Sequence, residues 1–228
     1  MMSDLAAVYL AAFWLGAAHA LEVDHMVAVG AFVGTRPRLA SAVGFGVRWG
    51  LGHAAAVLVV GTLVAASGLA VPESASRWAE FAVGVMLIAI GAWAFNLARQ
   101  IHVHTPDRHG GHGHLHAHPA PGPHEHHHSR ADKRHSHLST LVGAAHGLAG
   151  TAPVAALIPV TLLGDLGLAI GYLAVFGIGT VAAMGLYAAL ASLAVQRAAS
   201  SEKAARGVAR LTASASVAVG VWWIAASL

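Results

Sequence analysis

Six long apolar runs constrain this chain more than any other feature of its sequence. They are separated by Gly, Pro and polar clusters and cover residues 5–33, 39–66, 78–97, 138–163, 166–195 and 208–226. A helix needs about 20 predominantly apolar residues to cross the hydrocarbon core of a bilayer. The pattern therefore predicts an all-α polytopic membrane protein with six transmembrane helices embedded in a lipid bilayer.

The composition agrees with this class and excludes others. Only 10% of the residues are charged, against about 25% in a soluble domain. The chain has no Cys, which excludes a disulfide scaffold, a thiolate zinc site and a Cys nucleophile. Its basic residues are scattered between apolar runs, so we expect no nucleic-acid partner despite the net charge of +3. Neither a Walker-type nucleotide motif nor His-Glu-x-x-His occurs, and we expect no enzyme activity.

The distribution of Lys and Arg predicts an orientation. If all six runs span the membrane, residues 34–38, 99–137 and 196–207 lie on one side. Eleven of the 13 Lys and Arg residues lie in or just after these segments. The positive-inside rule then places the three segments in the cytoplasm and both termini outside, in the cell inner (plasma) membrane.

An internal repeat divides the chain. The sequence GAAHAL at residues 16–21 recurs as GAAHGL at residues 143–148, an offset of 127 residues. The same offset carries Trp49 onto Phe176. It also carries three glycines of the second run onto three of the fifth, namely Gly44, Gly50 and Gly52 onto Gly171, Gly177 and Gly179. Because the unit contains three spans, the second copy must insert upside down, which is typical of transporters.

The repeat predicts six transmembrane helices arranged as a 3+3 inverted repeat. Residues 1–98 form the first three-helix half and residues 139–228 the second. Residues 99–138 between them form a His-rich cytoplasmic loop, which we expect to be disordered.

Ionisable residues gather inside the apolar runs. The segment from His19 to His25 reads HALEVDH and holds two imidazoles and the carboxylates of Glu22 and Asp24. Such groups are costly in a bilayer and usually mark a binding site or a pathway. Imidazole and carboxylate ligands without thiolates suit divalent first-row metals. We therefore interpret His19, Asp24 and His25, with His53 of the second run, as a metal site.

Helix geometry constrains this interpretation. Each residue advances about 100° around a regular helix, which spreads His19, Asp24 and His25 around the axis. On a regular helix the three could not meet at one ion. Either the helix unwinds around residues 21–23, as transporter helices do at their sites, or only some of these residues touch the same metal, and we favour unwinding. In a regular helix, His19, Glu22 and His25 would share one face and form an alternative ligand set.

Two further residues of the apolar runs are candidate metal or pathway groups. Arg48 has a simple alternative, an ion pair with Glu22 or Asp24. His146 of the fourth run fits a hydrogen-bonded core histidine as well as it fits a ligand. An Asp–His pair could also relay protons without binding a metal.

The segment from His19 to His25 resembles the His-x4-Asp-His signature of the nickel/cobalt transporter family. Gly52-His53 resembles the Gly-His motif of that family's second helix, and AHGLAG at residues 145–150 resembles the start of the second half in its six-span, urease-accessory-like branch. The resemblance implies a secondary transporter of Ni²⁺ or Co²⁺, with uptake favoured and with His19, Asp24, His25 and His53 at the metal site. The metal is then cargo, and no cofactor is expected.

The chain departs from this family in three respects. Glu22 replaces the first Asp of the form His-Ala-x-Asp-Ala-Asp-His, many members have eight spans, and a Leu-Gly-x-Asp-Thr motif is not convincingly present. Six spans with a His-rich loop also resemble the nickel/cobalt efflux branch of the wider superfamily. A non-transporting, metal-binding accessory protein for urease or hydrogenase maturation is a further alternative.

Thirteen of the 17 His residues lie in residues 102–137. Tracts of this composition bind metals without a fixed geometry, and binding should fall below about pH 6.5 because the imidazole must be neutral. Such a cytoplasmic loop could receive imported metal, buffer it or load an exporter, and a cytoplasmic metallochaperone is one candidate partner. The His residues that form its densest clusters are His112, His114, His116, His118, His124, His126, His127 and His128.

Overall fold

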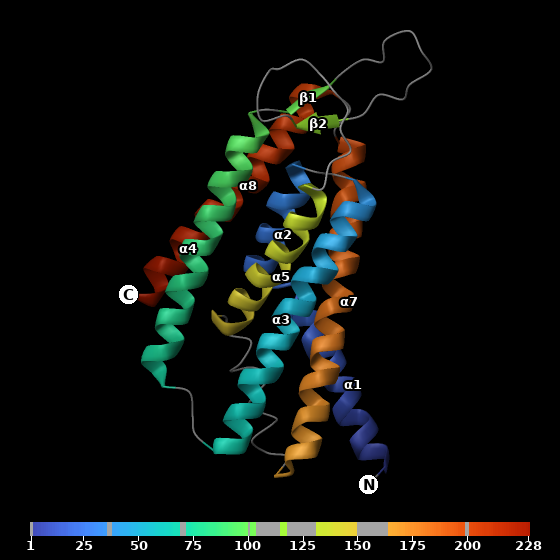
Figure 1. Cartoon of the computed structure of the whole chain (residues 1–228), viewed down its shortest axis with the longest axis vertical. Coiled ribbons are helices and arrows are strands. Elements are labelled where there is room, and N and C mark those ends of the chain that lie inside the picture. The colour runs from blue at the N-terminus through green and yellow to red at the C-terminus, as the bar shows by residue number, and fades with distance from the viewer. Residues whose placement is uncertain are drawn as a thin grey trace.

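The chain folds into helices that Figure 1 shows in an elongated bundle. This computed structural model describes residues 2–35, 38–68, 72–99, 101–103, 115–117, 131–149, 164–198 and 201–228. The helices are α1 (Met2–His19), α2 (Val23–Thr35), α3 (Leu39–Ser67), α4 (Glu73–Ala98), α5 (Ala131–Ala149), α7 (Leu166–Ala198) and α8 (Glu202–Ser227). Two short strands, β1 (Ile101–Val103) and β2 (Leu115–Ala117), pair antiparallel.

Four of the described helices, α3, α4, α7 and α8, are long and apolar enough to cross a membrane. Helices α1 and α2 together make a fifth candidate span, bent by 56° at the break between them. Large apolar side chains cover the outer surface, and Trp14, Leu63, Trp78, Leu186 and Leu211 are each more than half exposed. A surface of this kind is suited to lipid rather than to water, so the chain is a multi-pass membrane protein.

The fourth predicted span, at residues 138–163, falls partly outside the described residues. Helix α5 covers the first part of the fourth apolar run, and residues 150–163 of that run lie outside the described part of the chain. The described residues therefore account for four or five spans, and the span at residues 138–163 stays a prediction.

Local sequence explains where several helices begin and end. Helix α3 ends at Gly68, whose positive φ of 66° lets its backbone N donate to the Val64 carbonyl, 3.0 Å away. Helix α7 begins after Asp165, whose carboxylate accepts a hydrogen bond from the Leu168 backbone N at 2.8 Å. Helix α8 begins after Ser201, whose hydroxyl accepts from the Ala204 backbone N at 3.2 Å. The predicted loop positions thus terminate the helices.

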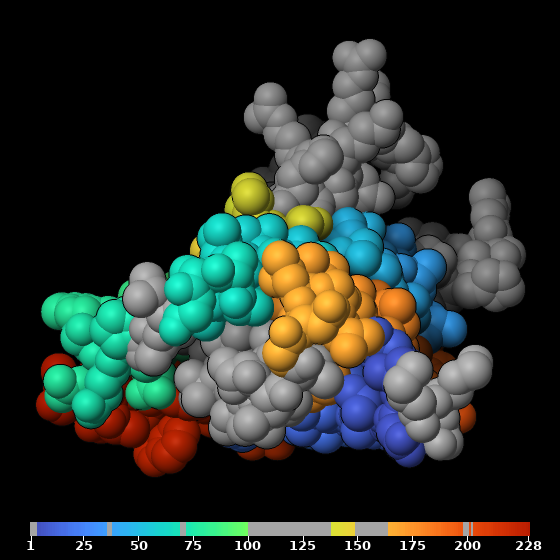
Figure 2. Space-filling model, turned by 90° about the horizontal axis from the view of Figure 1, so that it is seen from below, coloured from blue at the N-terminus to red at the C-terminus, as the bar shows by residue number. Residues whose placement is uncertain are grey.

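The helices form two groups with α2 and α5 between them. Helices α4 and α8 pack along each other on one side, and α1, α3 and α7 pack together on the other (Figure 1). Seen from below, Figure 2 shows the end of α3 beside the start of α7, with α1 on the other side of α7. Helices α2, α4 and α7 and the first half of α3 surround the largest buried apolar cluster, which includes Trp49, Leu87 and Met184.

The close contacts between these helices are reciprocal about the offset of 127 residues. A Cβ added at Gly16 would overlap the Phe176 carbonyl, and one added at Gly143 would overlap the Trp49 carbonyl. The offset carries Gly16 onto Gly143 and Trp49 onto Phe176. The glycine of each contact therefore corresponds to the glycine of the other, and the facing aromatic to the facing aromatic. The same relation links two further glycine contacts, Gly52 against Thr140 and Gly179 against Phe13. Helices α1 and α5 therefore approach α7 and α3 in the same way.

The segment predicted as a disordered loop contains part of the described structure. Helix α5 begins at Ala131, ahead of the apolar run. Ala, Lys and Arg favour helix, although this first part of α5 is too polar to span a membrane. Strands β1 and β2 also lie in the segment, with His102 opposite His116. Of the eight loop histidines named above, only His116 has a described backbone, and the other seven lie outside the described residues. Disorder and metal buffering in the loop remain predictions.

Candidate metal centre

A break in the first span positions the polar cluster. Helix α1 ends at His19 and α2 begins at Val23. Between them the backbone N of Leu21 and that of Glu22 each donate to a carbonyl three residues earlier, both at 3.0 Å. This tight turn confirms the predicted unwinding around residues 21–23. The turn contains neither Gly nor Pro. The polar side chains on either side of it, those of His19, Asp24 and His25, find partners in the protein interior.

Five ionisable side chains meet beside this break. His19, Asp24 and His25 come from the break, His53 from α3 and His146 from α5, and none is more than 4% exposed. The His25 ring is central, because its centroid lies 4.7 Å from that of His19, 5.0 Å from that of His53 and 4.2 Å from that of His146. The structure thus brings together all four residues predicted as the metal site, and it adds His146.

Both oxygens of the Asp24 carboxylate are engaged. Oδ1 accepts hydrogen bonds from the His25 backbone N at 2.8 Å and from His25 Nδ1 at 2.9 Å. Oδ2 accepts from His146 Nε2 at 3.0 Å. Hydrogen bonds of this kind offset part of the cost of burying a carboxylate among apolar helices.

His19 connects the cluster to the surface. Its Nδ1 lies 3.0 Å from Glu22 Oε1, and its Nε2 lies 3.2 Å from His53 Nε2. The Glu22 side chain is 43% exposed. Glu22 therefore borders the cluster without being enclosed by it, and the alternative ligand set of His19, Glu22 and His25 does not form a compact group.

The hydrogen bonds determine which ring nitrogens can bind a cation. A carboxylate only accepts hydrogen bonds, so the nitrogens that face Asp24 must carry the protons of neutral imidazoles. The opposite nitrogens, His25 Nε2 and His146 Nδ1, then carry lone pairs, and neither has a hydrogen-bond partner. The Glu22 carboxylate likewise requires a proton on His19 Nδ1, so His19 Nε2 accepts a hydrogen bond from His53 Nε2. The lone pair of His53 is then on Nδ1, which also lacks a partner. Buried nitrogens without partners are costly, and a metal ion would satisfy them.

The ligand atoms form two compact groups of three. Those of His19, His25 and His53 lie within 4.8 Å of one another, and so do those of Asp24, His25 and His146. A divalent metal binds His nitrogen at about 2.1 Å, so ligands on opposite sides of an ion lie about 4 Å apart. The first group therefore needs little contraction to hold an ion. In the second group, binding of an ion would also have to displace the imidazole protons that His25 and His146 donate to Asp24. Nitrogen and oxygen donors without thiolate suit nickel, cobalt, copper or zinc.

Arg48 does not belong to the cluster. Its Nε donates to the Ser139 hydroxyl at 3.3 Å, and it forms neither of the ion pairs expected with Glu22 and Asp24. That expectation was wrong because histidines already occupy both carboxylates. Arg48 instead links α3 to α5.

Two buried aromatic side chains cover the cluster and were not identified as site residues from the sequence. Phe176 of α7 stacks on His19 at a centroid distance of 5.8 Å, and Trp49 of α3 meets His146 edge-on at the same distance. The repeat relates the two contacts, because it carries Trp49 onto Phe176 and His19 onto His146. This correspondence was the signal in the sequence that could have assigned both aromatics to the site.

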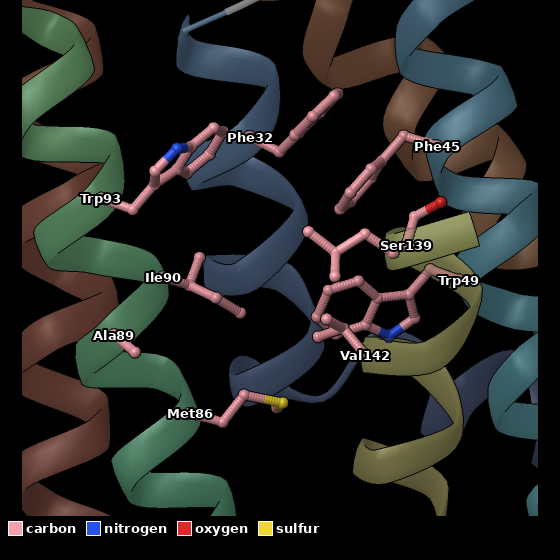
Figure 3. Close-up of a pocket in the computed structure, with 10 residues that line it drawn as sticks. Phe32, Phe45, Trp49, Met86, Ala89, Ile90, Trp93, Ser139 and Val142 are labelled. Carbon is pink, nitrogen blue, oxygen red and sulfur yellow. The ribbon is translucent and has the colours of Figure 1, made fainter. Parts of the chain in front are cut away.

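Trp49 also separates the cluster from an apolar cavity of about 320 Å³. Figure 3 shows that Phe32, Phe45, Ile90 and Trp93 surround this cavity with Trp49, and that the Ser139 hydroxyl is among its few polar groups. A cavity with so few ligands does not suit a cation. Within the described residues, the chemistry of metal binding is therefore concentrated in the histidine cluster.

Comparison with known proteins gives one relative. Over 181 residues the chain is 28% identical to a urease accessory protein UreH of Bacillus sp. (strain TB-90), and the match covers 79% of this chain and 74% of the relative. No model of a protein family matches the chain. No solved structure matches it.

Proposed function

We propose that this chain is a secondary membrane transporter, and not an enzyme, that carries Ni²⁺ or Co²⁺ through a midplane site. The observation that carries the proposal is the buried cluster of four histidines and Asp24 at a break in an otherwise apolar span. Ionisable groups in membrane helices are rarely structural, and broken helices commonly form the sites of transporters. His19, Asp24, His25 and His53 would bind the ion during its passage.

The choice of metal rests on ligand chemistry and on similarity. Imidazole and carboxylate donors accept several divalent metals, so the donors alone do not select nickel or cobalt. The resemblance of residues 19–25 to the His-x4-Asp-His signature of the nickel/cobalt transporter family favours those two metals. The name of the relative connects that protein with urease. A supply of nickel to such an enzyme is consistent with a nickel-binding membrane protein.

We further propose that the protein is a 3+3 inverted repeat with six spans, its halves being residues 1–98 and 139–228. The reciprocal glycine contacts support this arrangement, because a two-fold axis between the halves exchanges the two sides of each contact. Helices α3 and α7 run in opposite directions in Figure 1, as do α4 and α8. An axis in the membrane plane would produce this relation.

Uptake into the cytoplasm is the direction that we favour. The Lys and Arg distribution supports a cytoplasmic His-rich loop and external termini. In Figure 1 the ends of α2, α4 and α7 lie at the same end of the bundle as β1 and β2, which is compatible with one shared side for the three basic segments. Imported metal would then meet the loop and pass to a cytoplasmic metallochaperone.

Flux into vesicles tests the proposal. The full chain is reconstituted into liposomes, and accumulation of radioactive nickel is compared with that in empty vesicles. His25→Ala should reduce the flux by at least about ten-fold, because a lost ligand or lost ligand orientation weakens metal sites by this order. His112→Ala is the matched control, since it removes an imidazole outside the cluster.

A second candidate function is a metal-binding accessory protein that does not transport, and the name of the relative favours it. Nickel binding by wild-type protein without any protein-dependent flux would support that alternative over transport. Metal content of intact cells separates the two directions. Expression raises it if the protein imports metal and lowers it if the protein exports metal.

A further inference from the structure

The five buried ligands divide into two triads that have only His25 in common. His19 and His53 complete one triad, and Asp24 and His146 complete the other. We propose that the centre offers a single metal ion two alternative positions, each including His25, between which the ion moves without leaving the protein's ligands. This inference deepens the proposed function and rests on it.

Distances argue against one position that uses all five ligands. Among the described residues, ligand atoms lie within 4.8 Å of one another inside each triad and not across the whole set. The His25 ring contacts the other three imidazoles, and its centroid lies 4.7 Å from that of His19, 5.0 Å from that of His53 and 4.2 Å from that of His146. Asp24 lies against Nδ1 of His25, while Nε2 has no hydrogen-bond partner. An ion held with His19 and His53 can use Nε2, and an ion held with Asp24 and His146 has to displace the protons that now point at Asp24.

Charge argues against two ions at once. Asp24 is the one fully buried carboxylate of the cluster, and Glu22 is half exposed. Two dications a few ångströms apart would repel each other strongly in the low dielectric of the membrane interior. They would also have to share the single His25 ring. The two positions are therefore mutually exclusive.

The two triads draw on different parts of the fold. His19, His25 and His53 all come from α1, α2 and α3, in the first part of the chain, and Glu22 links this triad to the surface. The second triad needs His146 from α5 and is fully buried. A shift of α5 relative to α2 would therefore alter the second position and leave the first intact. Because both positions include His25, the position that the ion occupies would depend on how α5 lies relative to α2.

Cobalt titration of the full-length protein tests the inference, because Co²⁺ spectra report the ligand set. His25→Ala, which disrupts both positions, serves as the blank and removes the contribution of the loop histidines from every difference spectrum. His53→Ala should retain the second position, and His146→Ala should retain the first. Each variant is therefore expected to bind one ion, with a spectrum that differs from that of the other.

The association constants give a quantitative criterion. For mutually exclusive positions the wild-type constant is the sum of the two separate constants. At least one of His53→Ala and His146→Ala must then keep about half or more of the wild-type association constant. The variants His53→Gln and His146→Gln, which preserve side-chain volume, give the same comparison if an Ala variant fails to fold.

Three results would overturn the two-position arrangement. If the cobalt association constant fell by about ten-fold or more in both His53→Ala and His146→Ala, His53 and His146 would bind the same ion. Two ions per wild-type chain above the blank would indicate a bridged pair of metals. Equal cobalt binding by the wild type and by His25→Ala would show that the buried cluster binds no metal. Conversely, the expected binding together with absent vesicle flux would refute transport and leave the two positions standing.

Discussion

His146 and Asp24 are separated by 122 residues in the sequence, yet His146 Nε2 donates a hydrogen bond to Asp24 Oδ2 at 3.0 Å. The contact joins α5 to the start of α2 at the centre of the buried cluster. Because the same carboxylate also binds His25, Asp24 orients two imidazoles whose ring centroids lie 4.2 Å apart. Asp24 therefore orients two of the four imidazoles at the proposed metal site.

Asp24→Asn should weaken cobalt binding at the buried centre by about ten-fold or more, since loss of a ligand or of its orienting carboxylate has effects of this size. Titration against the His25→Ala blank measures the change. Asp165→Asn is the control, because it alters an exposed carboxylate that caps α7. Binding within about two-fold of wild type in Asp24→Asn would contradict the central role of this carboxylate.

Glu22→Gln should reduce nickel flux by about ten-fold, because Glu22 holds the proton-bearing Nδ1 of His19 and thereby directs the opposite nitrogen into the cluster. Vesicle uptake at low nickel concentration measures the effect. Glu73→Gln, at an exposed position in the first turn of α4, provides a control with the same chemical change. If both variants transported at the wild-type rate, the link from His19 to the surface would have no role.

Gly16→Ala and Gly143→Ala should both destabilise the protein, by about 1–3 kcal/mol each, because the added methyl group would overlap the backbone of a facing helix. Gly207→Ala is the matched control. It meets open space, and Ala favours helix over Gly by about 1 kcal/mol. Melting temperatures in detergent should fall for the first two variants and remain equal or rise for the third. Equal values for all three would contradict the close helix contacts.

Arg48→Gln should leave cobalt affinity at the buried centre within about two-fold of wild type, because Arg48 pairs with Ser139 and with neither carboxylate of the cluster. The same titration measures this. A loss comparable to that of Asp24→Asn would show that the charge of Arg48 acts on the metal site at a distance.

Replacement of the eight loop histidines by Ser should lower the total nickel capacity of the protein at neutral pH and leave the buried centre occupied. Equilibrium dialysis measures the capacity. In the wild type the additional nickel should be released as the pH falls below about 6.5, because protonated imidazoles do not bind metal. Nickel flux should persist in the Ser variant, and its loss would make the loop part of the transport path.

The sequence predicted the elements more completely than it predicted their contacts. The apolar runs identify α3, α4, α7 and α8 within a few residues, because span length and loop residues are local properties. The spread of His19, Asp24 and His25 around a helix was enough to predict the break. The pairing of His146 with Asp24 was not predictable from periodicity, since no local pattern records which distant helices face each other.

Arg48 also shows that a local sequence pattern does not identify the partner of a side chain on another helix. Its position in an apolar run suggested an acidic partner, and the preceding run holds two carboxylates, Glu22 and Asp24. Histidines satisfy both of them in the fold, which leaves Arg48 to a hydroxyl on α5. The repeat was the one long-range signal in the sequence, and it already placed His146 in correspondence with His19 and Phe176 with Trp49.

His19 and His146 each lie in the last turn of a helix, α1 and α5 respectively, and both helices end beside the cluster. The backbone carbonyls at a helix C-terminus carry partial negative charge equivalent to about half an electron. Two macrodipoles thus direct their negative ends at the space that an ion would occupy, while Asp24 in the first turn of α2 offsets the positive end of that helix. The peptide backbone itself would therefore favour cations over anions there, without any further acidic side chain in the membrane.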